Sequence, residues 1–347
     1  MKNLNKNLKD NLTIIIPTYN RAQLLYRSLS YYSKWNCRIL IADSSDVINT
    51  RIIDFKNSEY LYLKHHQFSN KIEYCLKLVK TRFVCISCDD DFFSYNGMIK
   101  AIEFLQNNTD YVAVHGRYSQ FRLENNVVYS YKQLPNKDCS IKDEKVLNRI
   151  LNSASIGLNP ISMLYKKDIL SNSLKICSDL PEMIEYTLNI IPLLYGKRAM
   201  LPVFWMARDV GKFTDYSIFK YGENIEERHF YKISLSNKII NTEIGRRYFN
   251  SILNLLDIQN KKNVDNISLL KKIFFEIYFP TNLVEKSIFN SYKRHFNIFI
   301  KMLLPNFMLF YYRGFVNNKS FSNKKSENED WEIIRNKILQ HGRIDTI

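Results

Sequence analysis

Three consecutive carboxylates, Asp89, Asp90 and Asp91, stand directly after the apolar run FVCIS. Adjacent aspartates repel one another, and each would have a raised pKa unless a cation lies among them. Mg²⁺ and Mn²⁺ take oxygen ligands, commonly one or two carboxylates together with substrate phosphate oxygens and water. We therefore predict a Mn²⁺ or Mg²⁺ site here. On an extended segment, Asp89 and Asp91 would project to one side and Asp90 to the other.

Two further groups of polar residues also follow apolar runs. The first group comes after LTIII and contains Pro17, Thr18, Tyr19, Asn20 and Arg21. The second comes after RILIA and contains Asp43, Ser44, Ser45 and Asp46. In an open α/β sheet, ligands bind beyond the carboxyl ends of the strands, so we expect all three groups to converge on one edge. A solvated acidic turn that caps the next helix is the alternative for the three aspartates.

The first 120 residues alternate short apolar runs with helical patterns, which is typical of a parallel α/β sheet. Strands are predicted over 12–17, 38–42, 60–64, 83–87 and 111–118. Helices are predicted from near Asn20, weakly over 47–55, over 69–80 with Ser69 as N-cap, and over 98–106. The fold class is therefore α/β, with a mostly parallel twisted sheet flanked by helices.

After residue 125 the pattern is looser. We predict strands over 127–132 and 198–208, a helix over 143–153, and a strand and turn over 161–170. The stretch SDLPEMIEYTLNIIPLLYG predicts one long helix, capped by Ser178 or Asp179 and ending near Gly196. Beyond residue 215 the chain is expected to be mainly helical, with a last short helix around WEIIRNKIL.

The segments IIIPTYNR, IADSSD and ISCDDDFF, in this order and spacing, resemble the nucleotide-binding half of glycosyltransferase family 2, the inverting enzymes of GT-A fold. The resemblance covers roughly residues 12–118. It implies a nucleotide-diphosphate sugar donor and a glycan or lipid-linked acceptor in surface polysaccharide synthesis. The family commonly has DDGSxD where this chain has ADSSD, which lacks the paired acid and the glycine.

The resemblance also assigns roles to individual residues. Pro17, Tyr19 and Arg21 would line the nucleotide pocket, and Asp43 would accept a hydrogen bond from the base. Asp89 and Asp91 would occupy the DxD positions near ribose and metal, with Asp90 among the donor-binding residues. His229 would complete the metal site, as a late histidine does in some GT-A enzymes.

An inverting transfer needs a base to take the proton of the acceptor hydroxyl. Asp179 and Glu182 are three residues apart, so both lie on one face of the predicted helix, near an N-terminus that favours ionised carboxylates. Glu182, the later Gly-Lys turn and a strand ending at Arg208 are similar to a bacterial subset of the family. Glu182 and Asp179 are therefore the predicted catalytic residues. In the alternative without catalysis, Asp179 is the N-cap of this helix and Glu182 is an acid of its first turn. Glu185 is a rival candidate for the base, but it is expected to be solvated.

The resemblance and the patterns together predict the organisation of the chain. Residues 1–215 would form a GT-A domain, with a nucleotide-sugar half at about 12–120 and an acceptor half at about 121–215. Residues 216–347 would form the helical C-terminal region. Its basic and apolar residues suit an interfacial helix, so peripheral membrane association is a further prediction. The apolar stretch at 302–312 is too short to span a bilayer.

The net charge of +16 attracts polyanions of any kind. Nucleic acid is not the expected partner, because the aromatic residues sit in periodic apolar segments. The six cysteines show no disulfide framework, and the first residues lack an apolar signal core. We therefore predict a cytoplasmic location, with the inner face of the cell membrane as the alternative within the cytoplasm. Cys85 and Cys88 are expected to be buried and not to bind one metal ion together. His115 is expected to be an edge histidine or to contact a ligand.

Other classes fit the sequence less well. A sugar-nucleotide pyrophosphorylase needs a glycine-rich signature after its first strand, and PTYNR has no glycine. A phosphatase of the haloacid type needs Thr or Val after DxDx, where this chain has Phe93. Two alternatives stay open: transfer of another group from a nucleotide diphosphate on the same fold, and a basic binding module without enzymatic activity.

Overall fold

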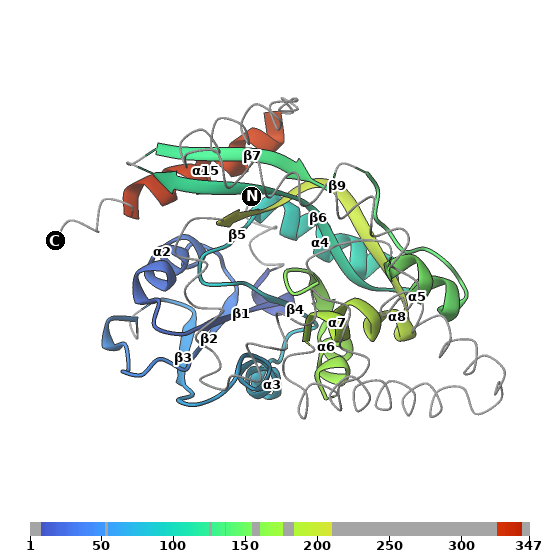
Figure 1. Cartoon of the computed structure of the whole chain (residues 1–347), viewed down its shortest axis with the longest axis horizontal. Helices are drawn as coiled ribbons and strands as arrows, with labels where there is room; N and C mark the ends of the chain where they lie inside the picture. Colours follow the sequence, from blue (N-terminus) through green and yellow to red (C-terminus); the bar gives the residue numbers. More distant parts are fainter. Residues whose placement is uncertain are drawn as a thin grey trace, which may run out of the picture.

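The computed structural model describes residues 8–209, apart from 53–54, 125–126, 136, 155–159 and 176–183, and then residues 325–341 (Figure 1). Within these residues the chain forms one mixed sheet of nine strands with helices on both faces. The order of eight strands is β3-β2-β1-β4-β8-β6-β9-β5, and β7 pairs with β6 outside this path.

The N-terminal half of the sheet is parallel. It contains β1 (Leu12–Thr18), β2 (Arg38–Asp43), β3 (Ser58–Tyr62) and β4 (Phe83–Ile86). The connecting helices are α2 (Ala22–Tyr32) and α3 (Phe68–Leu78), with a short 3₁₀ turn at Thr50–Ile52. In β1, Ile14 and Ile16 pack on one face of the sheet, and Ile15 packs on the other. All three are fully buried, which explains why these strands read as continuous apolar runs.

The second half of the sheet is mixed. β8 (Leu164–Lys166) runs antiparallel to β4 and to β6 (Tyr111–Glu124), whereas β9 (Lys197–Asp209) runs parallel to β6. β7 (Val127–Leu134) and the short β5 (Phe92–Phe93) complete the sheet. Because β5 pairs with β9 at Met206 and Ala207, the end of β9 returns to the three aspartates that precede β5.

Two apolar clusters cover the two faces of the sheet. One contains α2, α4 (Tyr95–Asn107) and α15 (Lys325–His341), and the other contains α3, α6 (Lys167–Leu174) and α7 (Ile184–Ile190). Two further short helices, α5 (Val146–Ala154) and α8 (Pro192–Tyr195), lie near the amino end of β9.

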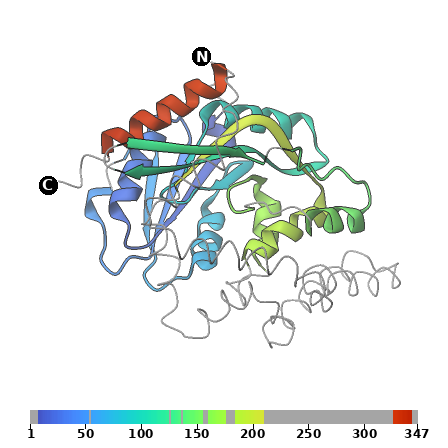
Figure 2. The same cartoon turned by 45° about the horizontal axis from the view of Figure 1, so that its top comes forward.

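The C-terminal helix α15 packs across α2, β7 and β9 (Figures 1 and 2). Its Ile334 and Ile338 are fully buried. Asp330 accepts a hydrogen bond from Asn96 at 2.9 Å and another from Ser94, the N-cap of α4. Nε2 of His341 lies 2.7 Å from the Ser30 hydroxyl of α2. The predicted last helix is therefore confirmed and belongs to this body.

Several local expectations were wrong. α3 starts at Phe68 with Gln67 as its N-cap, so Ser69 does not cap it. The long helix predicted up to Gly196 is interrupted: α7 ends at Ile190 and α8 starts at Pro192, which lacks the N–H that a continuous helix needs. In the described part of 47–55, which lacks 53–54, the predicted helix is replaced by the 3₁₀ turn.

The α/β class is confirmed, with its parallel strands in the N-terminal half. The predicted helical region 216–347 lies outside the described residues except for α15. None of the described helices is both long and apolar enough to cross a bilayer.

Candidate active site

The first polar group turns the chain from β1 into α2. Thr18 pairs with Asp43 across the carboxyl edge of β1 and β2. Asn20 has a φ of 52°, in the left-handed region that Asn tolerates better than most residues. Asn20 Nδ2 donates to Asp46 at 2.7 Å, and the Tyr19 hydroxyl donates to the same carboxylate at 3.2 Å. The first two groups therefore meet, as predicted from the sheet.

Asp43 is held by donors from its own neighbourhood. Its Oδ1 accepts from the backbone N–H of Ser45 at 2.8 Å and from the Ser45 hydroxyl at 2.5 Å. Its Oδ2 accepts from the Tyr60 hydroxyl on β3 at 2.6 Å. A carboxylate oxygen has two lone pairs, so Oδ2 keeps one acceptor position. Asp43 as a whole is 1% exposed, and its contact with a nucleotide base stays a prediction.

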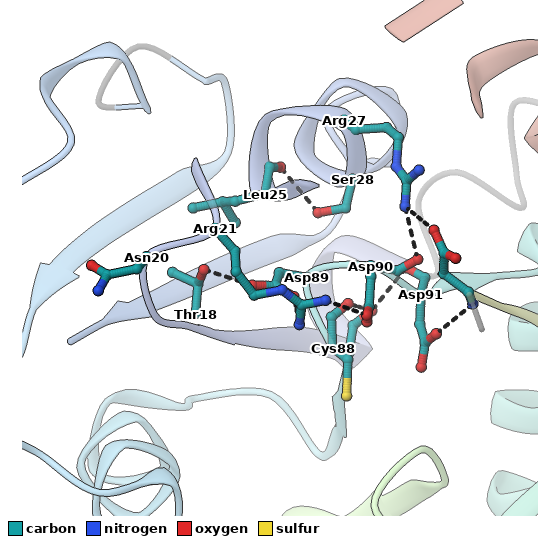
Figure 3. Close-up of polar contacts among 12 residues, drawn as sticks. Thr18, Asn20, Arg21, Leu25, Arg27, Ser28, Cys88, Asp89, Asp90 and Asp91 are labelled. Atoms are coloured by element: carbon teal, nitrogen blue, oxygen red, sulfur yellow. Dashed lines mark hydrogen bonds and ion pairs between the residues drawn. The ribbon is translucent and has the colours of Figure 1, made fainter. Parts of the chain in front are cut away.

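Arg21 bridges two of the three aspartates (Figure 3). Its guanidinium lies 2.8 Å from Asp89 and 2.6 Å from Asp90, and the Thr18 hydroxyl donates to Asp89 at 2.7 Å. Burial raises the pKa of Asp89 to about 7, although the Arg21 charge opposes the rise. Asp89 and Asp90 thus share one cation of the protein itself.

Asp91 has a different environment. It is 3% exposed, and its Oδ1 accepts from the backbone N–H of Asp209 at 3.1 Å. Among the described residues, no other hydrogen-bond donor reaches Asp91 and no cation pairs with it within 4 Å. Burial and the charge of Asp90 raise its pKa well above the usual range, while Arg208 attracts it from a greater distance. A buried carboxylate of this kind favours an added cation.

Arg27 fixes the end of β9 beside the aspartates. It is 5% exposed, its guanidinium pairs with Asp209 at 2.7 Å, and it also donates to the Asp90 carbonyl oxygen at 3.3 Å. The guanidinium lies over the rings of Phe92 and Phe121, at 5.3 and 5.8 Å from their centroids. This pair therefore helps to hold Asp209 N–H on Asp91.

Lys71 is a second buried cation under this edge. It is fully buried on α3, and its Nζ donates to the Thr18 carbonyl oxygen at 2.8 Å. Burial lowers its pKa to about 8, and the charges of Asp89 and Asp43 oppose this shift. Lys71 thus interacts electrostatically with both acids that are expected to contact the nucleoside.

The turn after β4 determines which groups could bind a metal. The backbone N–H of Asp91 donates to the Cys88 carbonyl oxygen at 3.1 Å, so the segment is a turn and the strand-like alternation expected for the aspartates is not observed. One ligand atom each from Cys88, Asp90 and Asp91 lie within 4.8 Å of one another. With Asp91, which has no cation within 4 Å among the described residues, this donor set fits a divalent cation. Asp90 pairs with Arg21 through Oδ2 alone, whereas one oxygen of Asp89 pairs with Arg21 and the other accepts from Thr18.

The other predicted site residues are placed as follows. Pro17 is buried in β1, and Tyr19 is partly buried behind Asp46. Asp179, Glu182 and His229 lie outside the described residues. Glu185 lies in the first turn of α7 and is exposed, as expected, although partial desolvation raises its pKa and the Arg208 charge opposes the rise.

The fold and this edge define an α/β protein that gathers carboxylates and buried cations where parallel strands end, the position at which nucleotides bind in this class. Residues 13–172 match the family described as Glycosyl transferase family 2. The match covers a little under half of the chain and identifies this part of it as a glycosyltransferase domain of that family. No curated protein matches the sequence.

Solved structures show distant similarity. S. aureus TarS 1-349 in complex with UDP-GlcNAc is 14% identical, with a TM-score of 0.44 over 75% of this chain and 75% of that chain. A longer TarS chain is covered over only 44% of its length, at 14% identity and a TM-score of 0.42 over 74% of this chain. The mannosyltransferase PcManGT from Pyrobaculum calidifontis, in complex with GDP-Man and Mn²⁺, is 12% identical, with a TM-score of 0.41 over 71% of this chain and 65% of that chain.

Three contributors to the site were not predicted from the sequence. Lys71 lies four residues before Cys75 on the buried face of α3, and a lysine on an apolar helical face was the available signal. Arg27 and Asp209 pair across 182 residues of chain, and no local pattern indicates such a pair.

Proposed function

We propose that this enzyme transfers a sugar from a nucleoside-diphosphate donor to a hydroxyl of a glycan or lipid-linked acceptor, with inversion and with the help of Mn²⁺ or Mg²⁺. The observation that carries the metal role is Asp91, a buried carboxylate that no described cation pairs with, beside Asp90 and Cys88. Surface polysaccharide synthesis remains the proposed pathway class, on the resemblance of the motifs.

Each part of the edge has a role in donor binding. Asp43 would accept from the base through the open position on Oδ2, with Tyr60 and Ser45 fixing its orientation. Asp89 would contact the ribose, held in place by Thr18 and Arg21. Short hydrogen bonds within the protein already hold Asp43 and Asp89, so the nucleoside would meet groups that are already oriented.

The diphosphate leaving group would lie at Asp90 and Asp91. A bound divalent cation would supply Lewis-acid stabilisation of the charge that develops on the diphosphate. Arg208, near Asp91 at the end of β9, is placed to add a second positive charge on the same side. Arg21, whose guanidinium already pairs with Asp89 and Asp90, would lie beside the donor phosphates.

The acceptor side would supply the base. Glu182 is the proposed base and Asp179 the second candidate, both just before α7 in the sequence. Glu185, in the first turn of α7, interacts electrostatically with Arg208 and so lies toward the aspartates. The support for Glu182 is that it stands three residues before Glu185 in the sequence.

Thermal shift measurements with UDP, GDP, CDP and dTDP, each with and without Mn²⁺, would test donor binding, because a ligand of the folded state raises the melting temperature. We expect one diphosphate to raise it, with a larger rise when Mn²⁺ is present. The Asp91→Asn variant should keep its fold and lose both the Mn²⁺ effect and turnover. Full turnover in Asp91→Asn would refute the metal role.

Peripheral association with an anionic membrane face in the cytoplasm is also part of the proposal. Its support is the net charge of +16 and the family's expected lipid-linked acceptors. Co-sedimentation with vesicles of anionic and of neutral lipids tests it: salt-sensitive binding to anionic vesicles alone is expected. Equal recovery in the supernatant with both lipid types would contradict it.

A further inference from the structure

The turn after β4 brings a cysteine to the proposed metal position. The bond from Asp91 N–H to the Cys88 carbonyl oxygen spans residues i and i+3 of a β-turn, which places the side chains of these two residues close together. In Figure 3 the Cys88 sulfur and the Asp91 carboxylate both point to the same side of the turn. The backbone turn therefore places the Cys88 sulfur near the Asp91 carboxylate.

The distances suit shared coordination of one ion. The ligand atoms of Cys88, Asp90 and Asp91 all lie within 4.8 Å of one another. Two ligands of one octahedral ion at about 2.1 Å are about 3 to 4 Å apart, and a sulfur ligand adds a few tenths of an ångström. Small side-chain rotations thus bring all three atoms onto one cation.

Cys88 also differs from the other described cysteines. Cys37, Cys75 and Cys85 are buried in the apolar clusters of the sheet, as expected for Cys85. Cys88, which was also expected to be buried, is only partly buried and stands beside two carboxylates. Cys139 is partly exposed as well, but among the described residues it belongs to no group of three ligands.

We propose that Cys88 is a ligand of the divalent cation, together with Asp90 and Asp91, and that this enzyme therefore selects thiophilic cations over Mg²⁺. Thiolate ligands favour softer ions such as Co²⁺, Zn²⁺ and Cd²⁺, whereas Mg²⁺ takes oxygen ligands. On binding, the sulfur–metal bond replaces the S–H bond, and the thiol proton goes to the solvent. The inference rests on the proposed metal-assisted function and specifies which ion that site prefers.

The test is direct metal binding to the full-length enzyme without substrate. Titration with Co²⁺ should give a thiolate-to-cobalt charge-transfer absorption in wild type and in the control Cys139→Ser, and none in Cys88→Ser. Calorimetry should show that Cys88→Ser loses Cd²⁺ affinity by about tenfold or more, while its Mn²⁺ affinity changes less than about threefold. Cys88→Ala gives the same readout if the serine variant does not fold.

Two results would overturn the inference in distinguishable ways. An unchanged charge-transfer band and unchanged Cd²⁺ affinity in both Cys88 variants would remove Cys88 from the site. If Mn²⁺ still strengthened nucleotide binding in those variants, the proposed function would stand. Absence of any binding of Co²⁺, Cd²⁺ or Mn²⁺ to wild type, with or without nucleotide, would overturn both the inference and the metal-assisted function.

Discussion

The buried histidine of β6 gives a prediction whose size follows from its environment. His115 is 5% exposed, and its Nδ1–H donates to the Gly116 carbonyl oxygen at 3.1 Å. Burial, with a further contribution from the Arg198 charge, lowers its pKa to about 4. The imidazole is therefore neutral at pH 7 in the folded protein, which fits a structural role for this residue.

The sign of the pH effect follows from linkage. In the unfolded chain a histidine titrates near pH 6.5, so between about pH 6.5 and 4 the unfolded state binds more protons at this residue than the folded state does. Stability contributed by His115 is thus fully present above pH 6.5 and is lost as the pH falls. From about pH 7.5 to about pH 5 the expected loss is about 2 kcal/mol in the free energy of unfolding.

Urea unfolding of wild type and His115→Gln at several pH values measures this contribution. The difference in unfolding free energy between the two proteins should change by about 2 kcal/mol over that range, in the direction that makes wild type relatively weaker in acid. His66 is exposed, so His66→Gln serves as the matched control and should follow wild type. Parallel pH profiles for wild type and His115→Gln would refute the reasoning.

Three further changes probe the core, the charge pair and the base. Ile338→Ala, on the buried face of α15, should lower the free energy of unfolding by about 3 kcal/mol, whereas Ile333→Ala, 55% exposed on the same helix, should change it by less than about 0.5 kcal/mol; equal effects would mean that α15 does not pack as described. Arg27→Met should cost about 3 to 5 kcal/mol because it leaves Asp209 buried without its cation. Adding Asp209→Asn should recover part of that loss in a double-mutant cycle, and strictly additive costs would contradict the pair. Glu182→Gln should keep the nucleotide-induced thermal shift and lose sugar transfer, and unchanged transfer would assign the base to another residue.

The local sequence pattern was sufficient to predict those strands and helices whose structure depends on burial alone. The strands β1, β2 and β4 were predicted because each is buried on both faces and reads as a short apolar run bounded by turn residues. The edge strand β3 is only partly buried, and its predicted bounds, 60–64, lie two residues beyond the observed Ser58–Tyr62. Helix ends were less predictable: the N-cap of α3 depends on the extended backbone of Gln67, and the break before α8 on the position of Pro192.

The partners of the acids were not predictable from local pattern. The sequence places three aspartates after β4, but it does not say that Arg21 pairs with the first two and that the third receives only the Asp209 N–H. The expected alternation of the aspartates failed because the segment turns, and this turn brings Cys88 to Asp91. Sequence reasoning therefore located the site without giving its charge balance.

The sequence by itself determined the α/β class, the existence of the N-terminal strands and the edge at which the acids gather, since each of these depends on residues close together in the chain. Only the tertiary structure decided which cation compensates which acid and where α15 packs. The contacts concerned join residues that are 69, 182 and 236 positions apart, from Arg21 to Asp90, from Arg27 to Asp209 and from Ser94 to Asp330. Such pairs form because burial in the folded chain makes an unpaired charge costly, and this cost does not exist in a short segment exposed to water.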